Sequence, residues 1–260
     1  KRRTGKTHLI NYIISKIYKN YDSVYVFSKT ANFQQDIFKY VPKNNIFDHL
    51  DEKALKTIWN AQAMYIDKHI KIAENEDKKL DKSKLKHILL ILDDIIGDKI
   101  EVRASKTLTD IAIAGRHLNF GTFFITQYFF GVPKVVRSNV DFAISFYLDG
   151  EGDRKDFIEQ YLSVNSNKMG RQIFEKIARK EFTAIVCCNY MSGKAPDGMI
   201  FSICAPEDYP MNFEINGDKK TFEKREKGYD PTGRSNSLLN FRTEGMRMKN
   251  KKEINRALKF

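Results

Sequence analysis

The chain has few of several residue types, and each shortage excludes a class of protein. Three cysteines among 260 residues are too few for a disulfide-built scaffold, and none has a partner at metal-ligand spacing. No apolar run approaches the length that crosses a bilayer, and the first residues do not resemble a signal peptide. We therefore expect no membrane partner, and we interpret Cys187, Cys188 and Cys204 as buried thiols in a reducing compartment.

Acidic residues are also scarce, at 33 against 45 lysines and arginines, which gives a formal charge of +12. Such an excess favours an anionic partner such as nucleic acid. A solvated, lysine-rich surface explains the same charge equally well, so charge alone does not decide between the two. The hydrophobic fraction of 42% and the charged fraction of 30% are typical of a globular protein with a sizeable core.

The first 147 residues alternate between strand and helix patterns. Residues 88–92 form a continuous apolar run, which suits a strand buried on both faces of a parallel sheet. Apolar residues between positions 10 and 21 recur at the spacing of a helix with one buried stripe. The alternation predicts an α/β fold with right-handed crossovers. The expected strands are 24–27, 88–92, 121–125 and 142–147, and the expected helices are 8–21, 32–40, 51–72, 105–118 and 133–139.

The pattern changes after residue 149. Two short helices, 153–162 and 168–180, precede two strands, 182–190 and 199–205, which we expect to pair antiparallel through the turn sequence Pro196-Asp197-Gly198. From residue 217 the apolar periodicity fades, and the remaining segment is rich in basic residues. We therefore predict one domain over residues 1–216, with a core at 1–147 and an extension at 148–216. A basic, weakly structured tail at 217–260 follows it.

A phosphate-binding motif precedes the first helix. The residues Arg3-Thr4-Gly5-Lys6-Thr7 match the second half of the P-loop pattern G-x-x-x-x-G-K-[ST], whose first glycine would fall one position before Lys1. A glycine-rich turn that leads into a helix offers backbone N–H groups and the positive end of the helix dipole to phosphate oxygens. Residues 3–7 are therefore expected to bind the phosphates of ATP. Lys6 would pair with the β- and γ-phosphates, and the Thr7 hydroxyl would bind Mg²⁺.

Carboxylates and an amide close two of the predicted strands. Asp93 and Asp94 follow the apolar run, as the Walker B acids of P-loop ATPases do. Asp93 would hold Mg²⁺, and Asp94 would polarise the water that attacks the γ-phosphate. Gln127 ends the next strand, and because ligands of open α/β sheets bind at the carboxyl ends of strands, we expect it to contact that water or phosphate. The alternatives are a plain strand-to-loop turn for the acids and a surface amide for Gln127.

These motifs together resemble those of poxvirus-type genome-packaging ATPases, which belong to the FtsK/HerA superfamily of DNA-pumping motors in large DNA viruses and their relatives. The P-loop, the Walker B acids, Gly115-Arg116-His117, Phe124-Ile125-Thr126-Gln127 and the stretch from Pro133 to Asp141 occur in the order of that family. The resemblance covers approximately residues 1–147. The chain departs from the family at its start, since the first P-loop glycine and the strand before it are not present, so the sheet is expected to lack its first strand.

The resemblance implies a RecA/FtsK-like P-loop fold and a ring of identical subunits, a hexamer or pentamer. Such a ring hydrolyses ATP to translocate double-stranded DNA, here to package a viral genome into capsids, and a capsid protein is a further implied partner. A neighbouring subunit would supply an arginine to the γ-phosphate, with Arg116 as the first candidate and Arg137 as the second. A surface arginine or a DNA-phosphate contact is the alternative for each. His117 is expected to cap its helix end or to contact phosphate.

The same resemblance implies that the protein acts in the host cytoplasm or in a viral factory. Association with the virion is a further alternative. DNA contacts of a motor go mainly to the phosphate backbone, and residues 74–86 and the basic tail are the candidates for them. Two other readings compete with the motor. The first is a P-loop nucleoside or nucleotide kinase, for which Arg154 would be the lid arginine. The second is a DNA-binding protein with a vestigial P-loop and no turnover.

Overall fold

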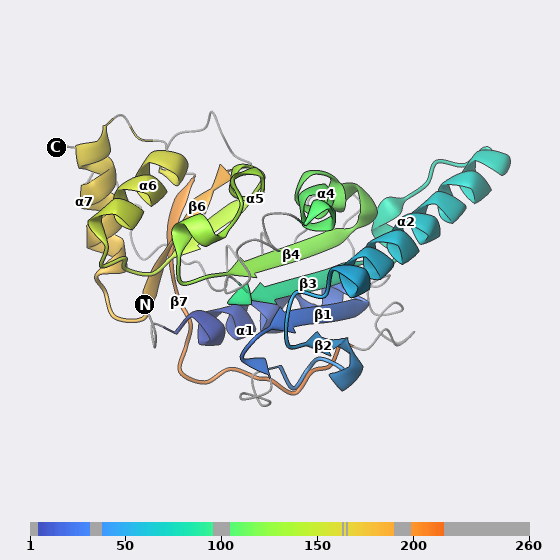
Figure 1. Cartoon of the computed structure of the whole chain (residues 1–260), viewed down its shortest axis with the longest axis horizontal. Coiled ribbons are helices and arrows are strands. Elements are labelled where there is room, and N and C mark those ends of the chain that lie inside the picture. The colour runs from blue at the N-terminus through green and yellow to red at the C-terminus, as the bar shows by residue number, and fades with distance from the viewer. Residues whose placement is uncertain are drawn as a thin grey trace. The chain divides into compact units, whose positions relative to one another are not determined.

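The computed structural model describes residues 5–31, 38–95, 105–162, 164, 166–189 and 199–215 (Figure 1). They form two compact units, and the boundary falls within helix α1 (Lys6–Ile17). One unit comprises Ser15–Asn139 with the segment that begins at Pro210, and the other comprises Val140–Tyr209 with the residues before Ser15. Most of the predicted helix 32–40, the turn at residues 196–198 and the tail at 217–260 lie outside the described residues.

The first unit contains a sheet of four parallel strands in the order β2-β1-β3-β4. Its cross-strand register sets Ser28 beside Asp93, and Asp93 beside Ile125. The carboxyl ends of three strands therefore meet at one edge, as the sequence predicted. The two-residue strand β2 was missed because so short a segment shows no periodicity. The strands are β1 (Ser23–Ser28), β2 (Ile46–Phe47), β3 (Ile88–Asp93) and β4 (Phe120–Ile125).

One face of this sheet packs against helices α2 (Glu52–Asn75) and α4 (Lys106–Ala114), which share its core cluster. The buried residues of α2 extend from Leu55 to Ile66, and the end of the helix projects beyond the strands (Figure 1). All six residues of β3 are buried, as expected for a central strand covered on both faces. Each buried leucine or isoleucine contributes about 1.5–3 kcal/mol. The apolar side chains that α2 and α4 bring to the cluster are Leu55, Ile58, Leu108 and Ile111.

Local signals set the ends of these helices. The Asp51 carboxylate accepts hydrogen bonds from the backbone N–H groups of Lys53 and Ala54, and the Ser105 hydroxyl accepts one from Leu108. The helix predicted at 105–118 continues past α4 as a 3₁₀ turn, Gly115–Leu118, and the predicted helix 133–139 is α5 (Lys134–Ser138). Within the described residues, no helix combines the length and the apolar character needed to cross a membrane.

The second unit contains an antiparallel sheet in the order β5-β6-β7. The predicted antiparallel pair is confirmed as β6 (Thr183–Cys188) and β7 (Ile200–Cys204). The predicted strand 142–147 is β5 (Phe142–Ser145), but it pairs with β6 in this separate sheet and not with the parallel strands. Its residues alternate between partly and fully buried, a pattern typical of a strand with one covered face.

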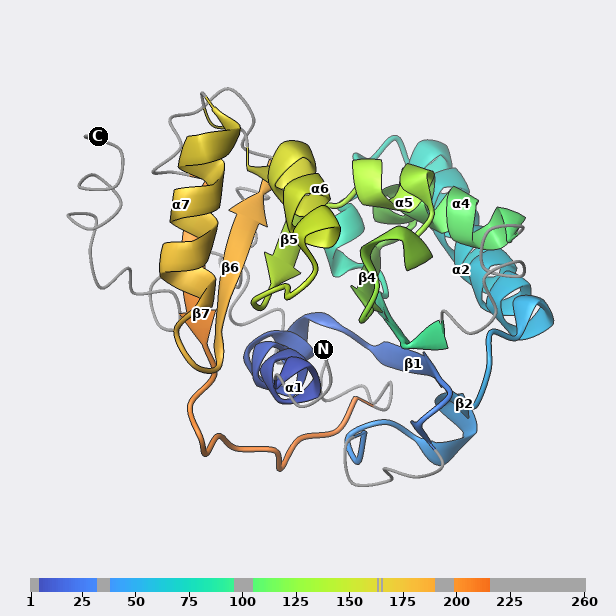
Figure 2. The same cartoon turned by 60° about the vertical axis from the view of Figure 1, so that its left-hand side comes forward.

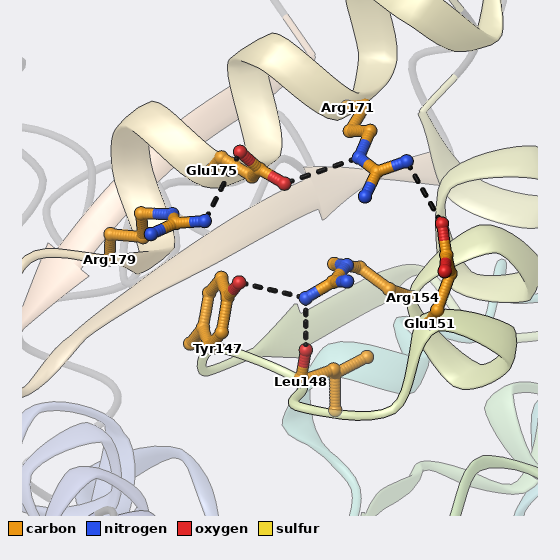
Figure 3. A network of polar contacts seen from close by, with 7 residues as sticks. All are labelled: Tyr147, Leu148, Glu151, Arg154, Arg171, Glu175 and Arg179. Carbon is orange, nitrogen blue, oxygen red and sulfur yellow. Dashed lines mark hydrogen bonds and ion pairs between the residues drawn. The ribbon is translucent and has the colours of Figure 1, made fainter.

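Helices α6 (Glu151–Tyr161) and α7 (Asn167–Ala178) belong to the same unit, and α7 lies along β6 (Figures 1 and 2). Arg154 of α6 is only 8% exposed, and its Nη1 donates to the Tyr147 hydroxyl at 2.8 Å and to the Leu148 carbonyl at 2.9 Å (Figure 3). The guanidinium of Arg179 lies 5.2 Å from the Tyr147 ring centroid. These contacts fasten the segment after β5 to both helices.

The cysteines differ in their surroundings, and all three are free. Cys187 and Cys188 are buried in β6, and burial raises the pKa of the Cys187 thiol. The expectation that all three are buried is wrong for Cys204, which is exposed at the last position of β7. The apolar sequence of β7 did not indicate at which residue the strand becomes exposed to solvent.

Candidate nucleotide site

Asp93 ends β3 and lies at the carboxyl edge of the parallel sheet, with 7% of its surface exposed. Its Oδ2 accepts a hydrogen bond of 3.2 Å from the hydroxyl of Ser28, which ends β1 and is 0% exposed. The Ser28 hydroxyl also accepts from the Thr30 N–H at 3.3 Å and lies 3.1 Å from the Thr30 hydroxyl. The carboxylate that the sequence assigned to Mg²⁺ is therefore held by a buried hydroxyl on the neighbouring strand.

Asp94 follows directly and leaves the line of the strand. Its φ of 49° is in the left-handed region, which aspartate tolerates better than most residues with a side chain. Its N–H donates to the Ile125 carbonyl at 3.0 Å, and its Oδ2 accepts from Nε2 of Gln127 at 2.8 Å. The structure thus brings together two residues, 33 positions apart, that the sequence assigned separately to the activation of water.

The turn that the sequence assigned to phosphate binding lies in the unit that contains the antiparallel sheet. Arg3 and Thr4 lie outside the described residues, and Gly5 has a φ of +85°, a conformation that glycine adopts without strain. A Cβ at this position would lie 3.7 Å from the nearest atom, so the backbone conformation and not lack of space favours glycine. Lys6 and Thr7 form the first turn of α1, where no acidic residue offsets the helix dipole. This arrangement fits a bound phosphate.

The donor set also fits Mg²⁺, which prefers oxygen ligands and is held in nucleotide sites by one or two protein groups together with phosphates. Thr7 and Asp93 supply a hydroxyl and a carboxylate of that kind. Because Thr7 and Asp93 belong to different units, their convergence on one nucleotide is part of the proposal below.

The two candidate arginines lie apart from each other. Arg116 is exposed in the 3₁₀ turn just before β4, so it lies at the amino edge of the sheet, about 20 Å along β4 from the edge that holds Asp93. Arg137 of α5 donates from Nε to the Val132 carbonyl at 3.1 Å. Its guanidinium lies 4.8 Å and 5.1 Å from the ring centroids of Phe129 and Phe130.

His117 is exposed, and the residue that closes its turn is Asn119. With a φ of 59°, Asn119 is the left-handed residue at the end of the turn, and its N–H donates toward the Arg116 and Gly115 carbonyls. The expected capping role thus falls to an asparagine two positions later.

Comparison with known proteins decides the family. The family model for the poxvirus A32 protein matches residues 1–178. The chain belongs to this family.

Two poxvirus proteins are similar to part of this chain. The chain is 27% identical over 182 residues to the DNA packaging protein OPG160 of monkeypox virus, an alignment that covers 65% of this chain and 57% of the relative. It is 26% identical over 182 residues to the OPG160 protein of vaccinia virus (strain Copenhagen), covering 65% of this chain and 63% of that one. The chain therefore matches less than two thirds of the length of these relatives.

Solved structures show the fold. B204, the DNA-packaging ATPase of Sulfolobus turreted icosahedral virus, matches with a TM-score of 0.52 at 15% identity, over 78% of this chain and 92% of B204. EssC (ATPases 2 and 3) of Geobacillus thermodenitrificans matches with a TM-score of 0.56 at 15% identity, over 87% of this chain and 42% of EssC. The pCW3 conjugation coupling protein TcpA, solved with ATPγS, matches with a TM-score of 0.54 at 15% identity, over 93% of this chain and 63% of TcpA. The chain therefore shares its fold with these three proteins, in agreement with the α/β architecture that the sequence predicted.

Sequence reasoning missed Ser28 and Thr30. The signal was available, because both are polar residues at the carboxyl end of a predicted strand, the position that identified Gln127. What the sequence could not supply was the register that places Ser28 beside Asp93.

Proposed function

We propose that this protein hydrolyses ATP with Mg²⁺ to translocate double-stranded DNA, and that it does so in packaging a viral genome. The observation that carries the proposal is the group formed by Asp93, Asp94 and Gln127 at the carboxyl edge of the parallel sheet. The names of the poxvirus relatives and the fold shared with B204 support it. The charge of +12 agrees with an anionic polymer as the partner.

Each residue has a role in this proposal. The backbone of residues 3–7 binds the phosphates, and Lys6 places its charge at the β/γ-phosphate. Thr7 and Asp93 would hold Mg²⁺, which would supply positive charge at the phosphate oxygens. Asp94 accepts a proton from the attacking water, and Gln127 orients the Asp94 carboxylate through their 2.8 Å hydrogen bond.

The proposal includes a ring in which a neighbouring subunit contributes an arginine to the γ-phosphate. Such an arginine contributes about 10³–10⁵ in rate in other P-loop enzymes. Arg137 suits the role because two aromatic rings and the Val132 carbonyl fix its orientation. Arg116 lies too far along β4 to serve its own sheet edge, so it could act only on the nucleotide of another subunit.

The alternative of a P-loop kinase depended on Arg154 as a lid arginine, and the position of Arg154 does not suit that role. A lid arginine must be mobile and reach an acceptor, whereas Arg154 is buried and donates to Tyr147 and Leu148. A transfer assay with labelled ATP and nucleosides tests this alternative directly. If the label appears in a phosphorylated nucleoside, the protein is a kinase and the translocase proposal is wrong.

ATP turnover with and without mixed-sequence duplex DNA tests the main proposal. We expect DNA to stimulate hydrolysis, Lys6→Ala and Asp94→Asn to abolish it, and Asp94→Asn to keep its affinity for ATP. Lys16→Ala, an exposed lysine on the same helix, and Asp67→Asn, an exposed aspartate on α2, are the matched controls and should behave as wild type. Hydrolysis that no DNA stimulates would remove the translocase, and normal hydrolysis by Asp94→Asn would remove Asp94 as the base.

A further inference from the structure

Two loops meet at the amino edge of the parallel sheet, opposite the nucleotide site. Residues 82–86 lead into β3, and residues 116–119 lead into β4. Because β3 and β4 are adjacent and parallel, with Ile88 beside Phe120, their entry loops lie side by side. We call these two loops the entry platform.

Buried and semi-buried amides fasten the two loops to each other. Gln62 of α2 is 3% exposed, and its Nε2 donates to the carbonyls of Lys86 at 2.8 Å and Leu118 at 2.9 Å. Nδ2 of Asn119 donates to the carbonyls of Lys82 at 2.8 Å and Lys86 at 3.4 Å. One buried amide group thus satisfies a carbonyl in each loop, which fixes their relative position.

The entry platform carries a concentrated positive charge. Lys82, Lys84, Lys86 and Arg116 are all exposed, and Asp81 is the one acid within residues 81–86 and 116–119. Four positive charges against one negative charge leave a net charge of +3 on residues 81–86 and 116–119.

Two of the four cations make side-chain contacts that position them. Nζ of Lys82 lies 3.5 Å from the His117 carbonyl, and Nζ of Lys86 lies 5.3 Å from the ring centroid of Tyr65 on α2. Hydrogen bonds from Ser83 lower the pKa of Asp81, so this carboxylate stays ionised and engaged within its own turn. The backbone of both loops is therefore held by amide hydrogen bonds, and contacts position the side chains of Lys82 and Lys86.

We propose that the entry platform binds the phosphate backbone of duplex DNA. Contacts to phosphates require lysines and arginines on a fixed surface and no groups that read bases, which suits a protein that grips any sequence. This inference rests on the proposed DNA translocation but concerns a separate surface, since β3 and β4 place about 20 Å between the platform and Asp93. It also gives Arg116 a role at DNA phosphates in place of the γ-phosphate.

The test compares two triple variants of the full chain that remove the same charge. The platform variant is Lys82→Gln/Lys84→Gln/Lys86→Gln. The control is Lys53→Gln/Lys56→Gln/Lys106→Gln, which changes exposed lysines near the starts of α2 and α4. Binding of a labelled mixed-sequence duplex is measured by fluorescence anisotropy at several salt concentrations. Equal melting temperatures establish that both variants are folded.

The slope of log affinity against log salt is negative. We expect the platform variant to reduce its magnitude by about 2.7, since each lost phosphate contact reduces it by about 0.9. Between about 50 and 200 mM salt this corresponds to an affinity change about 40-fold smaller than that of wild type. The control should keep the wild-type slope. Equal slopes for the two variants would overturn the inference, because only net charge would then matter.

Other outcomes separate this inference from the function on which it rests. If wild type binds no duplex DNA, the proposed function fails and the inference fails with it. If wild type binds DNA and the platform variant instead changes only the sedimentation of the protein, the platform is a contact between subunits and the inference alone fails. For Arg116→Gln, a slope whose magnitude falls by about 0.9 supports the assignment of Arg116 to a DNA phosphate. If Arg116→Gln instead slows hydrolysis without DNA by about 10³ at an unchanged slope, Arg116 is the arginine that a neighbouring subunit supplies to the γ-phosphate.

Discussion

The hydroxyl of Ser28 provides a sharp test of the nucleotide site, through the substitution Ser28→Ala. This change removes one oxygen atom from a side chain that is 0% exposed and leaves the backbone of β1 in place. The lost contacts are the 3.2 Å hydrogen bond to Oδ2 of Asp93 and the contacts of 3.3 Å and 3.1 Å with the N–H and the hydroxyl of Thr30. Asp93 then loses a donor that fixes the direction of its carboxylate, and Thr30 loses its contacts with the Ser28 hydroxyl.

Two effects of different size follow from this loss. A hydrogen bond to a charged group contributes about 1.5–3 kcal/mol, but this one is long and Asp93 has other interactions, so we expect a loss of about 1 kcal/mol in unfolding free energy. Groups that orient a metal ligand typically change metal affinity or activity by about 10–100-fold when removed. That range corresponds to about 1.4–2.8 kcal/mol, so the change in Mg²⁺ requirement should exceed the change in stability.

The assay is a Mg²⁺ titration of ATP hydrolysis, together with the melting curve of each variant. We expect half-maximal activity of Ser28→Ala to require about tenfold more Mg²⁺ or higher. Ser145→Ala is the matched control, because Ser145 is 8% exposed, ends β5 and donates to the Phe146 carbonyl at 2.8 Å. A Mg²⁺ requirement of Ser28→Ala within about twofold of both wild type and this control would refute the orienting role of Ser28.

Three further predictions concern the antiparallel unit. In Gly170→Ala the new Cβ would lie 2.6 Å from Cγ2 of Ile158, so we expect a loss of about 1–3 kcal/mol. Gly152→Ala on α6 meets nothing within 4 Å and should gain up to about 1 kcal/mol; urea unfolding measures both, and equal midpoints would contradict the packing argument. Because burial raises the Cys187 pKa above its ordinary value of 9.0, the folded state holds a proton that the unfolded state releases, so unfolding free energy should fall as pH rises above about 9. In the native protein a thiol reagent should modify Cys204 well before Cys187, and equal rates would contradict the burial of Cys187.

Much of the local structure was predictable because the signals that form it lie within a few residues of one another. The apolar run before Asp93 predicted a strand buried on both faces, and the turn before Lys6 predicted a helix start that suits phosphate. The caps at Asp51 and Ser105 act over three positions, so the starts of α2 and α4 were also accessible. Membership of the poxvirus A32 protein family followed from the order of such local motifs.

Contacts between distant segments were not predictable, since strand register and side-chain direction depend on the whole sheet. Ser28 and Asp93 are 65 positions apart, and the loops of Lys82 and Asn119 are 37 apart, yet neither pair has a pattern in the sequence that links them. The pairing of β5 with β6 is of the same kind, because a short strand carries no mark of its partner.

By itself the sequence determined the elements and the identity of the polar residues that end them, because helix and strand periodicity is a local property of the chain. The tertiary structure alone decided which ends meet. Parallel pairing places Ser28 beside Asp93 and joins the two entry loops at the opposite edge, since hydrogen-bond register aligns residues that the sequence leaves far apart.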